Sequence, residues 1–400
     1  MWKYKYLILF FAGLLLNCGD AAKTEDSTGP IVSPSKSYFV SATISNELTA
    51  ETLKTLAKGL GQNDLLEKIK YDVSTYKLVY KTTYNGQPIE ASGLIYIPKG
   101  LQGKAPLLSL QHGTTFKKND APSVTGEFYG VELFASAGYI SFMPDFIGYG
   151  ASSQVFHPYY DKTHSALAVI DMVKSVKEFL TKEKIEFNDQ LFLAGYSEGG
   201  YVTLAAAQEI ETNKAHNLTV TAVAAGAGGY DLSEMLKGVT TDIEYSYPSY
   251  LAFVLMSYNN TYNWNKPLTY FFRDNYATAL DTLLTGEYDG GFINSRLTTT
   301  IPDLFNTEFY ENLKEPQGEL QLKEAIVKNG VAGWKTQIPI RLYHGTNDEI
   351  IPYRNSEITL ENFKSQGSAD VTLTLIPGGG HGSSFLPMLK SFVPWFEEFR

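Results

Sequence analysis

The chain has a single cysteine, Cys18, among its 400 residues, so no disulfide can form within it. Basic residues are in the minority, because 33 lysines and arginines stand against 43 aspartates and glutamates, for a formal net charge of −10. This balance argues against nucleic acid as a partner. The sequence also lacks a cluster with metal-ligand spacing and a glycine-rich phosphate-binding motif. We therefore expect neither a metal nor another cofactor.

Long apolar runs are also lacking, since the apolar stretch 7–16 is too short to cross a bilayer. It follows a basic start and ends at Asn17-Cys18, a pattern similar to a bacterial lipoprotein signal. The similarity implies a signal peptide at 1–17 and a lipid on Cys18; the alternative is a plain signal peptide with an unmodified cysteine. Residues 18–37 have little to bury and are expected to form a flexible tether. We therefore expect an exported protein anchored in the cell envelope, in the outer membrane, periplasm-facing or surface-facing, or otherwise a secreted one.

The segment Gly195-Tyr-Ser197-Glu-Gly199 follows an apolar, strand-like run and precedes a helical pattern of small residues. A G-x-S-x-G motif between a strand and a helix is typical of a nucleophile elbow. Such a turn strains the serine backbone, and its glycines let the strand and the helix approach each other closely. We predict that Ser197 is a nucleophile; the alternative is an ordinary serine on a strand-to-helix turn.

A serine nucleophile needs a histidine to accept its proton and an acid to orient that histidine. Asp348 follows the strand-like run 340–343, and His381 lies in a glycine-rich loop after the run 371–376. His381 is the only histidine after Asp348, and the order serine, acid, histidine is that of one large fold family. We predict a triad of Ser197, Asp348 and His381.

Two other carboxylates could supply the acid: Glu349, next to Asp348, and Asp231, after the preceding strand. Asp348 could also be a plain turn residue, and His381 a plain loop histidine. His344 precedes the acid, so we expect it to bond backbone at the end of its strand.

A third group completes the predicted chemistry. The strand-like run 106–111 ends in His112-Gly-Thr-Thr115, where a loop can offer backbone amides to a developing oxyanion. We predict donors at the amides of Glu198 and of Thr114, with Thr115 as the alternative to Thr114. His112 is expected to be a structural member of this loop.

These motifs together resemble the α/β-hydrolase family, specifically its lipases and esterases, over roughly residues 72 to 400 except for an insertion. The segment 144–150 is also similar to one that follows the fourth strand in secreted lipases, with Asp145 holding the loop. The alternation of strands and helices predicts the same α/β architecture, a mostly parallel twisted sheet with helices on both faces.

The sequence pattern also predicts how the chain is organised. We expect a core at 38–231 and 336–400, interrupted by a mainly helical cap at 232–335 whose many aromatic residues line a substrate pocket or form the cap's own core. The elements expected are two short helices in 48–69, a hairpin of 76–84 and 89–97 around Asn85-Gly86, strands at 107–111, 139–143, 219–225, 338–343 and 371–376, and helices at 126–137, after a cap at Thr163, and at 386–399.

The function that these predictions favour is hydrolysis of a carboxyl ester through an acyl-enzyme, with a small-molecule or lipid ester as substrate and a membrane contact through the anchor at Cys18. A serine peptidase or an acyltransferase of the same fold is the alternative. A tethered binding protein on a hydrolase scaffold is a third reading, from a different class. The motifs do not choose among acylglycerols, aryl esters and polysaccharide esters.

Overall fold

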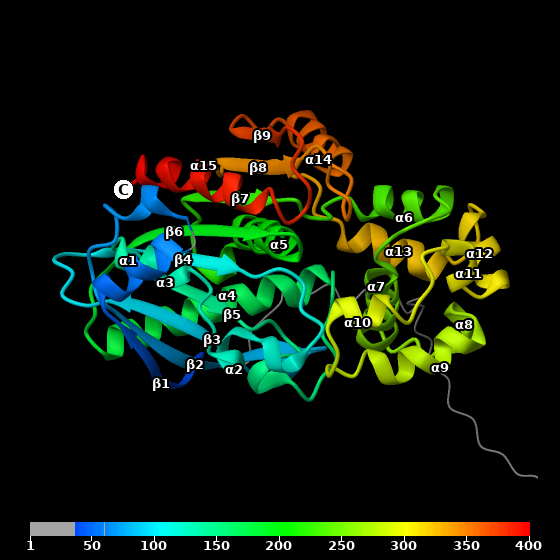
Figure 1. Ribbon diagram of the computed structural model, residues 1–400, viewed down its shortest axis with the longest axis horizontal. Coiled ribbons are helices and arrows are strands. Elements are labelled where there is room, and N and C mark those ends of the chain that lie inside the picture. The colour runs from blue at the N-terminus through cyan, green and yellow to red at the C-terminus, as the bar shows by residue number, and fades with distance from the viewer. Residues whose placement is uncertain (1–36, 60) are drawn as a thin grey trace, which may run out of the picture. The chain divides into compact units, whose positions relative to one another are not determined.

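A computed structural model describes residues 37–59 and 61–400 of the chain. Its centre is one nine-stranded sheet in the order β1-β2-β3-β5-β4-β6-β7-β8-β9 (Figure 1). The strands are β1 (Phe39–Leu48), β2 (Val73–Tyr84), β3 (Gln87–Pro98), β4 (Ala105–Gln111), β5 (Ile140–Pro144), β6 (Phe187–Tyr196), β7 (Ala222–Gly226), β8 (Ile340–Gly345) and β9 (Val371–Ile376). The predicted signal, tether and Cys18 lie outside the described residues.

The first strands form an antiparallel meander. β2 and β3 pair in unbroken register from Val73↔Pro98 to Tyr84↔Gln87, and the turn between them holds Asn85 and Gly86 at φ values of 49° and 73°. These are the positive φ angles that a two-residue hairpin turn requires, so the predicted hairpin is confirmed. β1 was not predicted; it pairs with β2 at the edge of the sheet, and all of its residues are partly or fully exposed.

From β5 to β9 every neighbouring pair of strands is parallel. The inner strands β4, β5 and β7 are buried along their whole length, as expected for a parallel sheet that is covered on both faces. The carboxyl ends of parallel strands meet at one edge, so the loops that follow β4, β6, β7, β8 and β9 gather there. The predicted fold class is confirmed.

Alternate strand residues enter two separate cores. Leu107, Leu193 and Val223 belong to the core under one set of helices, and Leu108 and Phe192 to the core on the opposite face. The first set comprises α4 (Lys162–Lys182), α5 (Glu198–Thr212) and α14 (Arg354–Ser365), and the second comprises α1 (Ala50–Gly59), α3 (Val131–Ser136) and α15 (Phe385–Glu397). Short helical turns complete the core: η1 (Asn63–Leu65), η2 (Lys118–Asp120), α2 (Pro122–Thr125), η3 (Gly150–Ser152) and η4 (Lys214–His216).

Two helix starts differ from the prediction. The helix expected at 126–137 begins only at Val131, because Gly126 and Gly130 adopt left-handed φ angles of 67° and 80°. The cap of α4 is Asp161, not Thr163: its carboxylate accepts a hydrogen bond from the His164 amide. An aspartate before the first turn satisfies free amides there as well as a threonine does.

Eight helices and no strand of the sheet lie between β7 and β8, where the cap was predicted. They are α6 (Leu232–Thr241), α7 (Pro248–Thr261), α8 (Leu268–Phe271), α9 (Asp274–Leu283), α10 (Gly290–Asn294), α11 (Ile301–Leu304), α12 (Thr307–Lys314) and α13 (Leu320–Asn329). In Figure 1 they lie beyond the ends to which the parallel strands point. We propose that residues 232–335 act as the cap over that edge.

Most of the cap's aromatic rings pack against one another. Tyr258, Phe271 and Phe272 are almost completely buried, and Phe271 meets Phe309 edge to face at 5.4 Å. The rings therefore largely form the cap's own core. Among the described residues, no helix is both long enough and apolar enough to span a membrane.

Candidate active site

Ser197 occupies the sharp turn between β6 and α5. Its backbone angles, φ 59° and ψ −126°, are strained for a residue with a side chain. Gly195 and Gly199 permit this turn, because a Cβ on Gly195 would clash with the Gly199 carbonyl and a Cβ on Gly199 with the carbonyls of Gln111 and His112. The strand, tight turn and helix of a nucleophile elbow are therefore all present.

The three residues predicted as a triad lie in direct contact. The Ser197 hydroxyl oxygen is 2.9 Å from Nε2 of His381, and Nδ1 of His381 is 2.7 Å from Oδ2 of Asp348. His381 is 9% exposed, and the Asp348 side chain is completely buried. The serine can thus donate to the imidazole while the imidazole donates to the carboxylate, which is the arrangement that nucleophilic catalysis by serine requires.

Asp348 is built to stay ionised. Burial alone raises the pKa of its carboxyl, but hydrogen bonds from His344 and His381 outweigh that effect and hold the pKa well below its usual range. Its second oxygen, Oδ1, accepts from the amides of Ile350 and Ile351 at 3.0 and 2.8 Å. The carboxylate is therefore fixed at both oxygens.

The other two candidate acids have different tasks. Glu349 accepts from the backbone amide of His381 at 2.9 Å, so it holds the histidine loop and not the imidazole. Asp231 caps α6 by accepting from the Glu234 amide. His344 is completely buried and bonds the Ile351 carbonyl at 2.8 Å as predicted for a structural residue, yet its Nε2 also lies 3.2 Å from Oδ2 of Asp348. That second contact was not predicted.

The loop predicted to supply oxyanion donors lies against the serine. A Cβ built on Gly113 would be 3.8 Å from the Cβ of Ser197, so the amide that follows Gly113, that of Thr114, is close to the nucleophile. As the first residue of α5, Glu198 has an amide with no acceptor inside the helix. The two amides lie on the two segments that meet at Ser197.

The loop itself is held by the segment after β5. His112 stacks on Phe146 at 4.1 Å between ring centroids, and its Nε2 is 3.3 Å from the carbonyl oxygen of Asp145. The buried carboxylate of Asp145 accepts from the Ser92 hydroxyl at 2.5 Å and from the Ser123 amide at 2.7 Å. His112 and Asp145 therefore have the structural tasks that the sequence predicted.

Sequence reasoning missed three residues of this segment that contact the site. His157 lies 2.7 Å from Oε1 of Glu198, the Tyr159 hydroxyl lies 2.9 Å from that of Thr114, and Tyr149 donates to the Thr115 carbonyl. The motif at 144–150 drew attention to the start of the segment. Nothing in the spacing of 149–159 indicated which side chains turn toward the serine.

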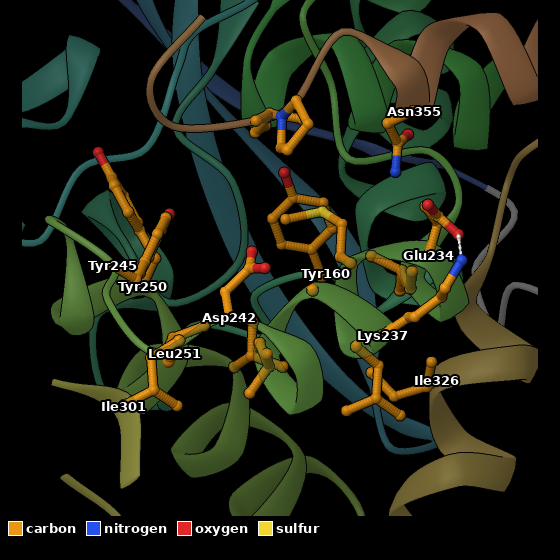
Figure 2. Close-up of a pocket in the computed structure, with 18 of the residues that line it drawn as sticks. Tyr160, Glu234, Lys237, Asp242, Tyr245, Tyr250, Leu251, Ile301, Ile326 and Asn355 are labelled. Carbon is orange, nitrogen blue, oxygen red and sulfur yellow. Dashed lines mark ion pairs between the residues drawn. The ribbon is translucent and has the colours of Figure 1, made fainter. Parts of the chain in front are cut away.

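A cavity of about 410 Å³ opens beside Ser197 and extends into the helices between β7 and β8. Figure 2 shows Tyr160 in its centre, Tyr245 and Tyr250 on one side, and the ion pair of Glu234 and Lys237 on the other. The lining is mainly aliphatic: Leu232, Met235, Leu236, Val239, Leu251, Val254, Leu255, Ile301, Leu313, Leu322, Ile326, Ile350 and Ile351. Of the two alternatives for the cap's aromatic residues, lining the pocket therefore holds for few of them, among them Tyr245 and Tyr250.

A second cavity, of about 1000 Å³, lies between the loop at 112–115, α3 and α15. It is lined by His112 to Thr115, Tyr196 and apolar residues that include Phe134 and Phe385. The described residues contain no group of three or more His, Cys, Asp or Glu that could hold a metal ion.

The sheet, the strained serine turn and its histidine and aspartate define an α/β-hydrolase. The model of the secretory lipase family matches residues 118–397, well over half of the chain, and the chain belongs to that family. The matched range includes Ser197, Asp348 and His381, and it begins just after the loop at 112–115. A comparison with curated proteins finds no match.

Solved structures show the same fold. A candidate hydrolase from Legionella pneumophila is 26% identical, with a TM-score of 0.82 over 90% of this chain and 98% of that one. A variant of the rice cell wall degrading esterase LipA from Xanthomonas oryzae is 23% identical, with a TM-score of 0.81 over 92% and 100%. Candida antarctica lipase A in its closed state is 13% identical, with a TM-score of 0.66 over 91% and 83%. With the family, these likenesses identify the chain as a carboxylic ester hydrolase of the lipase and esterase kind.

Proposed function

We propose that Ser197, His381 and Asp348 carry out ester hydrolysis through an acyl-enzyme. The observation that carries the proposal is the continuous chain of contacts from the Ser197 hydroxyl through His381 to Asp348, at 2.9 and 2.7 Å. His381 takes the serine proton through Nε2 as the hydroxyl oxygen attacks the ester carbonyl. Asp348 keeps the hydrogen on Nδ1 and stabilises the imidazolium that forms.

The rest of the cycle follows from the same groups. The carbonyl oxygen becomes an oxyanion, which we propose is bound by the amides of Glu198 and Thr114. His381 returns its proton to the departing alcohol, and the acyl group stays on Ser197. A water molecule then gives its proton to His381 and attacks the acyl carbonyl, which releases the acid and restores the serine.

The cavity beside Ser197 supports an aliphatic acyl chain as the group that it binds. Its lining is dominated by leucine, isoleucine and valine, which offer no hydrogen bonds that would orient a polar acyl group. Charged residues also line it: Glu234 and Lys237 on α6, Asp242 just after α6 and Arg354 at the start of α14. The side chains of Lys237 and Arg354 are more than half exposed, so their charges stay in contact with solvent. The ester carbonyl would then lie at Ser197 and the chain among the helices between β7 and β8.

Hydrolysis of p-nitrophenyl esters from acetate to palmitate tests this function. We expect turnover by the wild type, and losses of about 10⁴-fold or more in kcat for Ser197→Ala and His381→Ala. Asp189→Asn, a change to a fully exposed side chain near the start of β6, serves as the control that keeps wild-type rates. Equal rates in the wild type and Ser197→Ala would show that another residue is the nucleophile.

We also propose that the protein is exported and anchored through a lipid on Cys18. The support is the sequence pattern at 1–18 together with the family, whose description is secretory lipase. Metabolic labelling with a fatty-acid analogue in a bacterial host should label the wild type and not Cys18→Ala. Recovery of both proteins without label would show that Cys18 is not lipidated.

A further inference from the structure

Glu198 and His157 form a buried pair next to the nucleophile that hydrolysis itself does not use. Oε1 of Glu198 lies 2.7 Å from Nε2 of His157, and the two side chains are 2% and 6% exposed. Glu198 directly follows Ser197 and begins α5, whereas His157 lies between β5 and α4. Glu198 therefore has its backbone amide beside the nucleophile and its carboxyl group against His157.

Hydrogen-bond geometry determines how many protons the pair holds. Nδ1 of His157 lies 2.7 Å from the carbonyl oxygen of Ile147, which can only accept, so Nδ1 carries a hydrogen. At 2.7 Å, Nε2 and Oε1 must then share one further hydrogen between them. The pair is either an imidazolium with a carboxylate or a neutral imidazole with a carboxylic acid, and its net charge is zero in both cases.

The pair lies among aromatic rings and close to the predicted oxyanion, so an uncancelled charge on it would be costly. Aromatic rings pack around His157, with centroids 4.8 Å away for Tyr149, 5.9 Å for Tyr159 and 5.7 Å for Phe253. Burial and then the charge of Glu198 raise the pKa of Tyr149, whereas burial, then Tyr160 and then Glu198 raise the pKa of Tyr159. The carboxyl group is therefore electrostatically close to both hydroxyls. A carboxylate here without His157 would be a buried negative charge one residue from the nucleophile, where the oxyanion also becomes negative.

The same segment also contacts the opposite side of the predicted oxyanion site. Tyr159, two residues after His157, meets the Thr114 hydroxyl at 2.9 Å, and Tyr149 donates to the Thr115 carbonyl. His157 is packed against the backbone here, since a Cβ on Gly148 would lie 2.7 Å from its amide nitrogen. The segment from Asp145 to Asp161 thus connects the two chain segments that would offer amides to the oxyanion.

We propose that His157 is a positioning residue of the active site. By sharing a proton with Glu198 it fixes the first residue of α5, so that the Glu198 amide stays aimed at the oxyanion, and it cancels the charge of the carboxyl group. The inference rests on the proposed function, in which Ser197 is the nucleophile.

A charge-cancelling pair and a pair that only packs respond differently to a second substitution. His157→Leu removes the partner and leaves the carboxyl group; His157→Leu with Glu198→Met removes both groups and keeps the length of the glutamate side chain. His216→Leu with Glu209→Met is the matched control, because His216 and Glu209 form the same kind of contact, at 2.8 Å, at the other end of α5.

The experiment measures kcat, KM and the inhibition constant of an alkyl boronic acid, which becomes a tetrahedral anion on a serine. We expect His157→Leu to lower kcat and to weaken boronate binding in parallel, by about 10- to 100-fold, with little change in KM. The double variant should recover part of that loss, since it no longer buries an uncompensated charge. It should stay slower than the wild type, because the contact that fixes the first residue of α5 is still missing. The control should lower Tm and leave kcat and boronate binding at wild-type values.

The proposal is overturned if the double variant is slower than His157→Leu, or if His157→Leu affects kcat no more than the control does. Should His157→Leu fail to fold, His157→Gln and its combination with Glu198→Gln repeat the comparison with a smaller change in packing. Ser197→Ala, assayed alongside, separates the two claims. An active Ser197→Ala refutes the proposed function, whereas an inactive one with a fully active His157→Leu refutes only the role of His157.

Discussion

Nε2 of His344 lies 3.2 Å from Oδ2 of Asp348, the oxygen that also bonds His381 at 2.7 Å. Nε2 of His344 faces a second acceptor as well, the Ile351 carbonyl, so that nitrogen must carry the hydrogen. Its Nδ1 lies 2.6 Å from the Ser356 hydroxyl oxygen. A fully buried histidine therefore helps to fix the acid that orients His381.

His344→Phe should consequently slow the reaction without greatly changing substrate binding. We expect kcat to fall by roughly 10- to 100-fold because Asp348 loses a donor and can turn away from His381. His344→Gln offers an amide donor and should lose less. Steady-state kinetics on one p-nitrophenyl ester provides the comparison, and equal rates for wild type and His344→Phe would show that the contact has no influence on the acid.

Glu132 on α3 should make stability depend on pH. It is 4% exposed, and Oε2 has no hydrogen-bond partner among the residues that the structure describes. Burial raises its pKa from 4.5 to about 7. The folded state then holds a proton that the unfolded state releases above pH 4.5, so the stability linked to this proton is full below pH 4.5 and is lost as pH rises through about 7.

The raised pKa of Glu132 corresponds to a loss of about 3 kcal/mol in the free energy of unfolding between pH 4.5 and pH 8. Glu132→Gln cannot lose a proton, so its Tm should exceed that of the wild type at pH 8 by more than at pH 4.5. Glu127→Gln, on an exposed neighbour, should show no such difference. A Tm gap between wild type and Glu132→Gln that is the same at both pH values would contradict the assignment.

Gly199→Ala should disable the elbow. The added Cβ would meet the carbonyl oxygens of Gln111 and His112, so α5 and the oxyanion loop would have to separate. We expect a loss of about 100-fold in kcat, because small displacements of catalytic groups are costly, together with a lower Tm. Gly59→Ala is the control, since a Cβ at the end of α1 meets nothing within 4 Å. Wild-type activity in Gly199→Ala would rule out this packing.

Val254→Trp should shorten the acyl chains that are accepted. Val254 on α7 lines the cavity beside Ser197, and an indole there would fill part of its roughly 410 Å³. We expect kcat/KM for the palmitate ester to fall by at least about tenfold more than for the acetate ester. Val327→Trp, on the outer surface of α13, should leave the chain-length profile intact. If Val254→Trp and Val327→Trp gave the same chain-length profile, the acyl chain would not enter this cavity.

Much of the fold could be predicted because its signals are local. The Asn85-Gly86 dipeptide, the apolar runs before Ser197 and Asp348 and the glycines of the elbow each impose a backbone conformation within a few residues. The helix at 126–137 failed for an equally local reason, since left-handed Gly126 and Gly130 delay its start. β1 gave no comparable signal, because it lies at an edge of the sheet and alternates only weakly.

Some residues of the candidate site could likewise be predicted from local signals, and others could not. Ser197, Asp348 and His381 were predicted because their order and their positions at strand ends are visible in the sequence. His157 and Tyr159 were missed because their contacts depend on how the segment after β5 folds back over the start of α5 and the loop at 112–115. Which of the cap's rings line the cavity could not be predicted, since the sequence gives the number of aromatic rings between 232 and 335 but not the direction in which each one points.

The identity of the nucleophile is the claim on which the rest depends, and covalent trapping tests it most directly. The wild type should be inactivated by an alkyl fluorophosphonate and carry one adduct, which mass spectrometry of peptides would place on Ser197. Ser197→Ala should carry none, and His381→Ala should react far more slowly because the hydroxyl has lost its base. An adduct on any other residue, or an active enzyme that the reagent does not modify, would contradict the account.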